Sequence, residues 1–256
     1  METIEHQHRV ISQFTLQAKP FAEHQAHSQR ESFDTLRDLA ELSGSERVLD
    51  CGCGPGLVSC YLADYAREVV GVDLTQAMID QAGAAAASRG LANVSFQAGN
   101  VTALPFEVGE FDVTVSRYAF HHLENPEMAF REMLRVTRPG GRIVVADAAP
   151  PTAKRANYDA FEKRRDPSHT SALTLEELYF LGERAGLGEV VIRSFGVPMT
   201  LDSLIDSSFP DAADRIVLRE MIQADVGVDA LSFNARVEDG VHLITFPIAA
   251  LVWKKG

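Results

Sequence analysis

The feature that most constrains this chain is the run Val48–Gly56, which reads Val-Leu-Asp-Cys-Gly-Cys-Gly-Pro-Gly. Apolar residues lead into it and glycine takes every second place at its end, so it predicts a strand, a tight turn and the start of a helix. Glycine permits positive φ and lets the backbone approach a bound molecule closely. Because free amides at a helix N-terminus point the same way, we expect a ligand to lie on this turn.

A second apolar run ends in a carboxylate at Gly71-Val72-Asp73. An acid at the end of a strand can accept two hydrogen bonds from the hydroxyls of a ribose, so turn and acid together predict a nucleoside site. The dinucleotide fingerprint would place its third glycine at position 57, where this chain has Leu57. The spacing therefore favours a different nucleoside cofactor and leaves a nicotinamide-dependent oxidoreductase as the alternative enzyme.

With these residues the chain resembles the class I S-adenosylmethionine-dependent methyltransferases, whose first motif reads acid-x-Gly-x-Gly-x-Gly. The resemblance implies S-adenosylmethionine as the cofactor and the small-molecule type of this family. The cofactor-binding residues that it implies are Asp50, Gly52, Cys53, Gly54, Gly56, Asp73, Leu74, Met78, Asn100, Val101 and Ser116.

The resemblance also implies which part of the cofactor each of these residues contacts. Asp50 and the amides of 52–54 would face the methionine portion, and Asp73 would hold the ribose. Asn100 stands where the family usually has an aspartate, which weakens a charge-assisted contact to the adenine amino group but keeps a carbonyl acceptor. Asparagine is equally a common turn residue. The other contacts to the base would come from Leu74, Met78 and Val101.

Further segments keep the order of the family, at 99–106, 111–116 and 134–141. The closest likeness is to the ubiquinone/menaquinone biosynthesis methyltransferase group. It rests on Gln13-Phe14, Gln17-Ala18 and the stretch Arg165-Asp166-Pro167-Ser168-His169.

Short apolar runs alternate with helical stretches from Arg47 onward, which predicts a parallel sheet covered by helices. We expect an α/β, doubly wound, mostly parallel seven-stranded sheet with an antiparallel edge strand. The expected strands are 47–51, 68–73, 94–98, 111–116, 141–147, 188–195 and 241–253. The expected helices are 56–66, 76–89, 126–137, 152–165, 174–186 and a helical section that ends near 226.

The domain organisation follows from the same pattern. Residues 1–44 have helical spacing in two pieces separated near Pro20 and are expected to form an N-terminal helical cover. Residues 45–256 form the α/β domain, with 150–186 and 198–239 as additions that shape a substrate pocket. Ligand-binding loops are expected beyond the carboxyl ends of the strands.

The segment Ser116–His122 follows the fourth expected strand and contains a guanidinium, a phenol and two imidazoles. A neutral imidazole can accept a proton as a methyl group arrives, so His121 and His122 are the candidate catalytic residues. Histidines that pack or cap the loop are the alternative for both. The candidate substrate-binding residues are Arg117, Tyr118, Arg165 and His169. Arg165, Asp166 and His169 could instead pair with one another, and Arg165 could lie on a solvated face.

Composition limits the partners. The chain has 24 basic and 36 acidic residues, a net charge of −12, which opposes binding to nucleic acid. Three cysteines at 51, 53 and 60 suit neither a disulfide framework nor a zinc site, and we expect no metal. No apolar run is long enough to cross a bilayer and no signal peptide is recognised, so we expect a cytoplasmic protein, with a homodimer as one option.

These observations predict a methyltransferase that moves a methyl group from S-adenosylmethionine to an O, N or C atom of a small, aromatic or quinonoid metabolite. Methyl transfer from a sulfonium requires mainly that the protein align the nucleophile and sometimes remove a proton. An S-adenosylmethionine-binding protein without turnover, acting as a sensor or partner subunit, is the alternative from another class.

Overall fold

The centre of the molecule is a mixed β-sheet, seen in a computed structural model that describes residues 3–24 and 30–256, without the side chains of 19–24. The strand order is β3-β2-β1-β4-β5-β8-β6, and the short β7 pairs with β8 outside this path. The strands are β1 (Arg47–Cys51), β2 (Glu68–Asp73), β3 (Val94–Ala98), β4 (Phe111–Arg117), β5 (Thr137–Ala148), β6 (Val190–Thr200), β7 (Arg236–Glu238) and β8 (Val241–Lys254).

The strands β3, β2, β1, β4 and β5 are mutually parallel, and β8 runs antiparallel to both β5 and β6. The order reverses direction between β1 and β4, which is where an open α/β sheet binds its ligand. The predicted fold class is thus confirmed, including the antiparallel pairing of the last two long strands. The outermost of that pair is β6, and β8 lies inside it.

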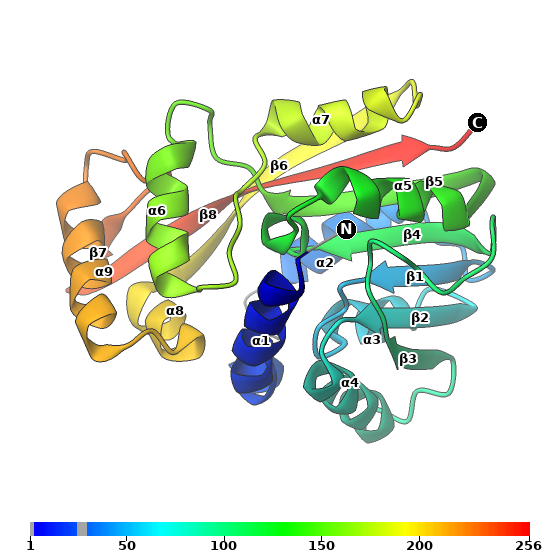
Figure 1. The fold of residues 1–256 in the computed structure, drawn as a ribbon, viewed down its shortest axis with the longest axis horizontal. Helices are drawn as coiled ribbons and strands as arrows, with labels where there is room; N and C mark the ends of the chain where they lie inside the picture. Colours follow the sequence, from blue (N-terminus) through cyan, green and yellow to red (C-terminus); the bar gives the residue numbers. More distant parts are fainter. Residues whose placement is uncertain (1–2, 25–29) are drawn as a thin grey trace.

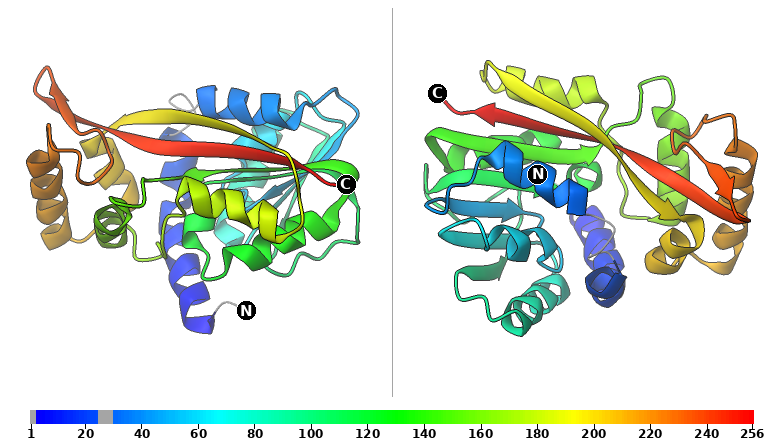
Figure 2. Two further views of the ribbon diagram at one scale, coloured as in Figure 1. Left: turned by 90° about the horizontal axis from the view of Figure 1, so that it is seen from above. Right: turned by 180° about the vertical axis from the view of Figure 1, so that it is seen from behind.

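Helices cover both faces of this sheet (Figure 2, left). On one face α2 (Arg30–Ala40) and α3 (Leu57–Leu62) bury an apolar cluster that includes Leu36, Val48 and Val113. On the other face α5 (Pro126–Val136) and α7 (Leu175–Arg184) pack on a cluster that includes Phe130 and Trp253. Such two-sided burial is the reason why the central strands are almost continuously apolar.

A second, smaller lobe stands on the far ends of β6 and β8, which continue beyond the sheet as a long ribbon (Figure 1). It contains α6 (Arg155–Arg165), α8 (Leu201–Ser208), α9 (Ala212–Asp225) and β7. Its own apolar cluster includes Phe161, Leu218 and Phe233. The lobe therefore has a core separate from that of the main sheet, and the ribbon joins the two.

The N-terminal helix α1 (Ile4–His24) packs between α4 (Gln76–Ser88) of the main domain and α8 of the lobe (Figure 1). Gln13 Nε2 donates a hydrogen bond to the backbone carbonyl of Ser208 at 2.9 Å. The expected break near Pro20 is wrong, because the backbone of α1 continues to His24. A proline removes one helical hydrogen bond and crowds the carbonyl four residues earlier, which can kink a helix without ending it.

Several element boundaries also differ from the sequence expectation. The helix expected over 56–66 ends at Leu62, where the chain turns toward β2, and the strand expected over 141–147 begins already at Thr137. The strand expected over 188–195 extends to Thr200, because the ribbon pairs with β8 along its whole length. The helical section before 226 consists of two helices, α8 and α9.

Candidate active site

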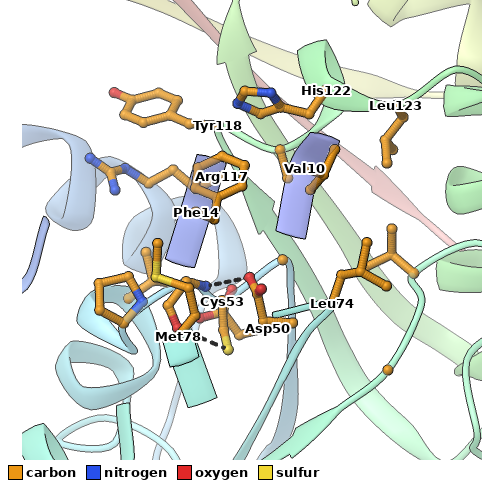
Figure 3. Close-up of a pocket in the computed structure, with 18 of the residues that line it drawn as sticks. Val10, Phe14, Asp50, Cys53, Leu74, Met78, Arg117, Tyr118, His122 and Leu123 are labelled. Atoms are coloured by element: carbon orange, nitrogen blue, oxygen red, sulfur yellow. Dashed lines mark hydrogen bonds between the residues drawn. The ribbon is translucent and has the colours of Figure 1, made fainter. Parts of the chain in front are cut away.

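A cavity with an empty volume of about 980 Å³ lies beyond the carboxyl ends of β1, β2, β3 and β4, and α1 closes one side of it with Val10 and Phe14 (Figure 3). This is the edge on which the sequence placed its ligand loops. Of the predicted site residues, its wall contains Asp50, Gly52, Cys53, Gly54, Asp73, Leu74, Met78, Asn100, Val101, Arg117, Tyr118 and His122.

The glycine turn after β1 needs glycine for two reasons: close packing against a neighbouring loop at Gly52 and exposure of the backbone to the cavity at Gly54. A Cβ at Gly52 would lie 2.7 Å from the Cβ of Ala119, so this glycine lets the loops after β1 and β4 approach each other. Gly54 has φ 52°, and a Cβ there would meet no atom within 4 Å among the described residues. Because Gly54 lines the cavity, its bare backbone faces the space that a ligand would fill.

Asp73 ends β2 and is held by two backbone amides. Its Oδ2 accepts from Gly54 N at 2.9 Å, and its Oδ1 accepts from Thr75 N at 2.9 Å. Burial raises the pKa of this carboxyl, although the two amides oppose the shift. Each carboxylate oxygen keeps a further lone pair, so Asp73 can still receive the two hydroxyls of a ribose.

Asp50 lies at the end of β1 and is fully buried in the wall of the cavity. Burial raises its pKa to about 6, although Ser59 Oγ donates to Asp50 Oδ2 at 2.6 Å and Arg117 also favours the charged form. A buried carboxylate of this kind gains from a cationic ligand, because a nearby positive charge restores part of the lost solvation. An ammonium group fits this position.

Asn100 lines the cavity beyond β3 and closes a local turn. Its Oδ1 accepts from Thr102 N at 2.9 Å and from Thr102 Oγ1 at 2.8 Å. The turn role that sequence reasoning allowed is therefore present. The backbone carbonyl of Asn100 accepts from Ala103 N at 3.0 Å as part of the same turn. The side-chain amide nitrogen is not used by the turn and can contact a base.

Two predicted cofactor residues, Gly56 and Ser116, are not part of the cavity wall. A Cβ at Gly56 would lie 2.8 Å from the Cβ of Ala82, so this glycine allows α3 and α4 to pack closely. Ser116 Oγ is buried and donates to the carbonyl oxygen of Cys51 at 2.8 Å, which ties β4 to β1. Both residues therefore stabilise the turn and its neighbouring elements from outside the cavity wall.

A second cavity of about 700 Å³ adjoins the first and shares Phe14, Tyr118 and His122 with it. Its wall is formed by the main domain and the lobe together. The remaining lining residues are His121, Ala148, Tyr158, Glu162, Arg165, Asp166, Val197, Met199, Leu204, Phe246 and Ile248.

Tyr118 turns the chain sharply between the two cavities. Its φ of 58° is unusual for a residue with a bulky side chain, and its amide donates to the carbonyl of Ala146 at 2.9 Å. Such a conformation persists only where the surrounding structure holds it, and it clusters at functional sites. The turn leaves Arg117 on the wall of the first cavity only, whereas Tyr118 reaches both.

His121 is paired with Asp147, the residue near the end of the neighbouring strand β5. The distance between His121 Nδ1 and Asp147 Oδ1 is 2.5 Å, and Asp147 Oδ2 accepts from Phe120 N at 2.7 Å. Burial works against the imidazolium, but the carboxylate outweighs it and raises the pKa of His121. The proton on Nδ1 faces Asp147, so the neutral ring offers Nε2 as its acceptor.

His122 contacts Ser168, which in turn contacts Asp166, and its pKa is shifted in the opposite direction from that of His121. Ser168 Oγ donates to Asp166 Oδ1 at 2.5 Å and lies 3.1 Å from His122 Nδ1. Since a hydroxyl has one proton and Ser168 gives it to Asp166, His122 Nδ1 must be the donor to Ser168. Burial and the nearby His121 lower the pKa of His122 to about 3, so this ring stays neutral.

The charged groups on the lobe side are largely paired with one another. Arg165 forms two hydrogen bonds with Glu162, from Nε to Oε1 at 2.9 Å and from Nη2 to Oε2 at 2.6 Å, and a third with Ser208 Oγ at 2.8 Å. Asp166 is charged, since Arg165 and the hydrogen bonds from Ser168 lower its pKa in spite of burial. The wall of the second cavity is therefore slightly acidic.

His169, which was expected to touch the substrate, lines neither cavity. Its Nε2 lies 2.8 Å from Asp159 Oδ1, and Asp159 also accepts from Ala172 N at 2.9 Å. The alternative that His169 pairs with a neighbour is the arrangement found.

Sequence reasoning missed two kinds of site residue. Val10 and Phe14 come from α1, which was expected to form a helical cover without either residue being named as part of the site. Asp147 comes near the end of an apolar strand, as Asp73 does, and that signal could have identified it.

Among the described residues, no cluster of three or more His, Cys, Asp or Glu side chains could hold a metal ion. No helix in the same residues is long and apolar enough to span a membrane.

These residues fit S-adenosylmethionine. The bare backbone at Gly54, the doubly held carboxylate of Asp73 and the buried Asp50 offer a turn, a ribose acceptor and a partner for an ammonium group. Met78 and Leu74 supply apolar surface for a base along the same wall.

Comparison with known proteins agrees with this site. Residues 49–145 match the family model described as a methyltransferase domain. The chain is 30% identical over 194 residues to the uncharacterized methyltransferase YcgJ of Bacillus subtilis (strain 168), covering 75% of this chain and 77% of that protein. It is also 30% identical over 216 residues to a demethylmenaquinone methyltransferase of Thermus thermophilus, covering 84% of each.

The crystal structure of YcgJ from Bacillus subtilis superimposes with a TM-score of 0.81 at 26% identity, covering 88% of this chain and 98% of that one. Family membership also removes the nicotinamide alternative. The chain belongs to the class I S-adenosylmethionine-dependent methyltransferases, of the small-molecule type.

Proposed function

We propose that this enzyme methylates a small, uncharged, largely apolar acceptor with an ionisable hydroxyl, such as a phenol or a hydroquinone. The observation that carries the proposal is the position of His121, which is paired with the buried Asp147, in the wall of a second cavity that adjoins the cofactor cavity at His122. A base thus stands beside the place where both reactants would meet.

The wall of the second cavity supports an uncharged acceptor. Aromatic and aliphatic side chains form most of it, including Tyr158, Phe246 and Ile248. In the part of the chain that the structure describes, Arg165 is the one Lys or Arg side chain on this wall, and Glu162 and Ser208 already engage its guanidinium. An anionic acceptor would meet Asp166 there without a free cation from these described residues to balance it, which disfavours carboxylated substrates.

The bound cofactor supplies an electrophilic methyl carbon for an in-line displacement. His121 accepts the hydroxyl proton of the acceptor at Nε2, and Asp147 stabilises the imidazolium that forms. His122 cannot take up this proton at neutral pH, because its pKa is about 3. Its neutral ring, with Nδ1 bonded to Ser168, instead offers a fixed acceptor that can orient the hydroxyl.

Phe14 excludes water from the junction. Its ring stands at 81° to that of His122 with the centroids 4.8 Å apart, and it lines both cavities. A methyl donor exposed to water could lose its methyl group unproductively, so closure by α1 protects the reaction. For a phenolic acceptor the same base serves oxygen methylation and methylation of an adjacent ring carbon, since both begin with loss of the hydroxyl proton. The demethylmenaquinone methyltransferase relative is consistent with this chemistry.

The test is a methyl-transfer assay with isotopically labelled S-adenosylmethionine and three matched acceptor panels: neutral phenols and hydroquinones, the same rings carrying a carboxylate, and primary amines. We expect transfer to the first panel and a loss of about 10²- to 10⁴-fold in kcat for His121→Asn. His242→Asn, in β8, is the matched control and should retain activity.

Transfer only to carboxylated rings or to amines would overturn the substrate class, and equal activity of His121→Asn and wild type would overturn the base. Cofactor binding measured by calorimetry, with no transfer to any panel, would favour the binding protein without turnover.

A further inference from the structure

Arg117 carries a guanidinium that forms no ion pair among the described residues and has one buried nitrogen without a partner. It is the last residue of β4, and its side chain lines the cofactor cavity but not the second cavity. Its guanidinium carbon lies 4.8 Å from the ring centroid of Phe33 and 4.0 Å from that of Tyr118. Nε donates to Ser32 Oγ at 2.8 Å. Two aromatic faces and a hydroxyl therefore fix the plane of the guanidinium.

The outer part of this guanidinium is not satisfied. Nη2 is buried and has no hydrogen-bond partner, and no carboxylate lies within ion-pair distance of Arg117, among the residues that the structure describes. Burial lowers the pKa of Arg117, although Tyr118 and Asp50 favour the charged form. Leaving a buried cation without an anion is costly, so a protein that keeps one usually has a ligand for it.

The position of Arg117 identifies which ligand group it faces. Asp50, Gly52 and Cys53 share the cavity wall with it, on the side assigned to the methionine portion of the cofactor. In Figure 3 the guanidinium lies on the opposite side of the view from Leu74 and Leu123. An amino acid end carries one positive and one negative group, and the wall offers one buried carboxylate and one unpaired guanidinium.

We propose that Arg117 binds the α-carboxylate of the methionine portion of S-adenosylmethionine, through Nη2. Asp50 faces the ammonium group of the same portion. Asp50 and Arg117 together therefore bind the two opposite charges of the amino acid end. This replaces the sequence-based expectation that Arg117 contacts the acceptor. The inference rests on the family cofactor and not on the acceptor class proposed above.

Ligands that lack one group at a time test this assignment directly. S-adenosylhomocysteine keeps the α-carboxylate of the cofactor. Compared with S-adenosylmethionine, the decarboxylated form lacks only the carboxylate, and 5′-methylthioadenosine lacks the whole amino acid end. Calorimetric titration of wild type and Arg117→Gln should show S-adenosylhomocysteine bound about 10- to 100-fold more weakly by the variant. The other two ligands should change by less than about twofold, since they make no contact with the substituted group.

Two further variants complete the design. Arg193→Gln removes an exposed arginine from β6 and should leave all three affinities unchanged. Arg117→Lys keeps the charge without the planar fork and should recover part of the affinity for S-adenosylhomocysteine. Thermal unfolding without ligand checks that each variant is folded, and the lysine variant carries the test if Arg117→Gln is not.

Two outcomes would overturn the proposal. If Arg117 substitutions weaken S-adenosylhomocysteine and 5′-methylthioadenosine equally, the residue acts only by packing against Phe33 and Tyr118. If they leave S-adenosylhomocysteine unchanged and raise the KM of the acceptor, Arg117 belongs to the acceptor site. Binding of 5′-methylthioadenosine by the wild type keeps this result separate from any failure to find an acceptor.

Discussion

The imidazole of His6 and the backbone carbonyl of His122 are 2.6 Å apart, at Nε2 and O. His6 is buried in the first turns of α1, and its Nε2–H donates to the loop that carries both candidate catalytic histidines. The helix that closes the cofactor cavity is therefore attached directly to the loop where the acceptor would lie.

His6→Ala should weaken this attachment. A hydrogen bond of this kind contributes about 0.5–1.5 kcal/mol, so we expect affinity for S-adenosylhomocysteine to fall by about two- to tenfold, because closure of α1 becomes less favourable. Calorimetric titration measures the change. His8→Ala, which alters an exposed histidine on the same helix, is the control, and equal affinities for the two variants would contradict a closing role for His6.

The pH dependence of kcat should follow His121. The base acts only when its ring is neutral, and Asp147 raises its pKa, so kcat should increase with pH through a value above about 6.5. Asp147→Asn removes the countercharge and should shift this limb to lower pH while decreasing the plateau. A pH–rate profile of both proteins measures the shift, and an unchanged limb would argue against His121 as the base.

The same pair should affect stability with a defined sign. Because the pKa of His121 is raised in the folded state, its stabilising contribution is complete below about pH 6.5 and is lost as the pH rises through the folded-state pKa. The lowered pKa of Asp147 means that the contribution also disappears in acid, below about pH 3.9. Urea unfolding of wild type and His121→Asn should differ most near pH 5.5, and the difference should shrink as the pH rises through the raised pKa of His121. A difference that grows with pH would contradict this assignment.

Ser168→Ala should remove the contact that keeps the proton of His122 on Nδ1. Without the hydroxyl between Asp166 and Nδ1, the ring loses the partner that fixes its proton, so we expect kcat to fall by about tenfold with little change in cofactor affinity. Nitrogen NMR of labelled histidine reports the proton position directly. If His122 keeps its proton on Nδ1 in the variant, the relay does not set the tautomer.

Glycine substitutions should separate ligand approach from packing. Gly54→Ala adds a side chain to a left-handed residue that faces the cavity, which costs about 1–2 kcal/mol in stability and also obstructs the cofactor. Gly56→Ala would press on Ala82 instead, so it should destabilise the fold more and reduce cofactor binding only through that loss. Parallel unfolding and titration of both variants distinguish the two effects, and a Gly54→Ala protein with full affinity would refute close approach.

The local patterns of the sequence predicted the sheet and the cofactor turn because both depend on short segments. The alternation of apolar runs defines the parallel strands, and the carboxyl ends of parallel strands meet at one edge, which brings Asp50, Asp73 and Asn100 together. The antiparallel pairing of β8 with β6 was also predictable, since the resemblance implied an antiparallel pair.

The contacts that were missed are made between distant segments. Nothing near His122 in the sequence indicates that α1 supplies Phe14 and His6 to the same site. Likewise, the side on which a residue packs decides its role: His169 turns toward Asp159, and Ser116 toward Cys51. Such choices depend on the complete fold, because neighbouring residues on a loop can face opposite ways.

The long ribbon of β6 and β8 has a consequence for how this enzyme can diversify. One end of β8 is a central strand of the cofactor-binding sheet, and the other end carries the side chains that would surround the acceptor. If the second cavity holds the acceptor as proposed, we expect substitutions at Val197, Met199 or Phe246 to change acceptor preference. They lie in a lobe with its own core, so the register of β8 against β5 should be preserved. Selection for a new acceptor and conservation of the methyl donor can act on the same strand, one at each end.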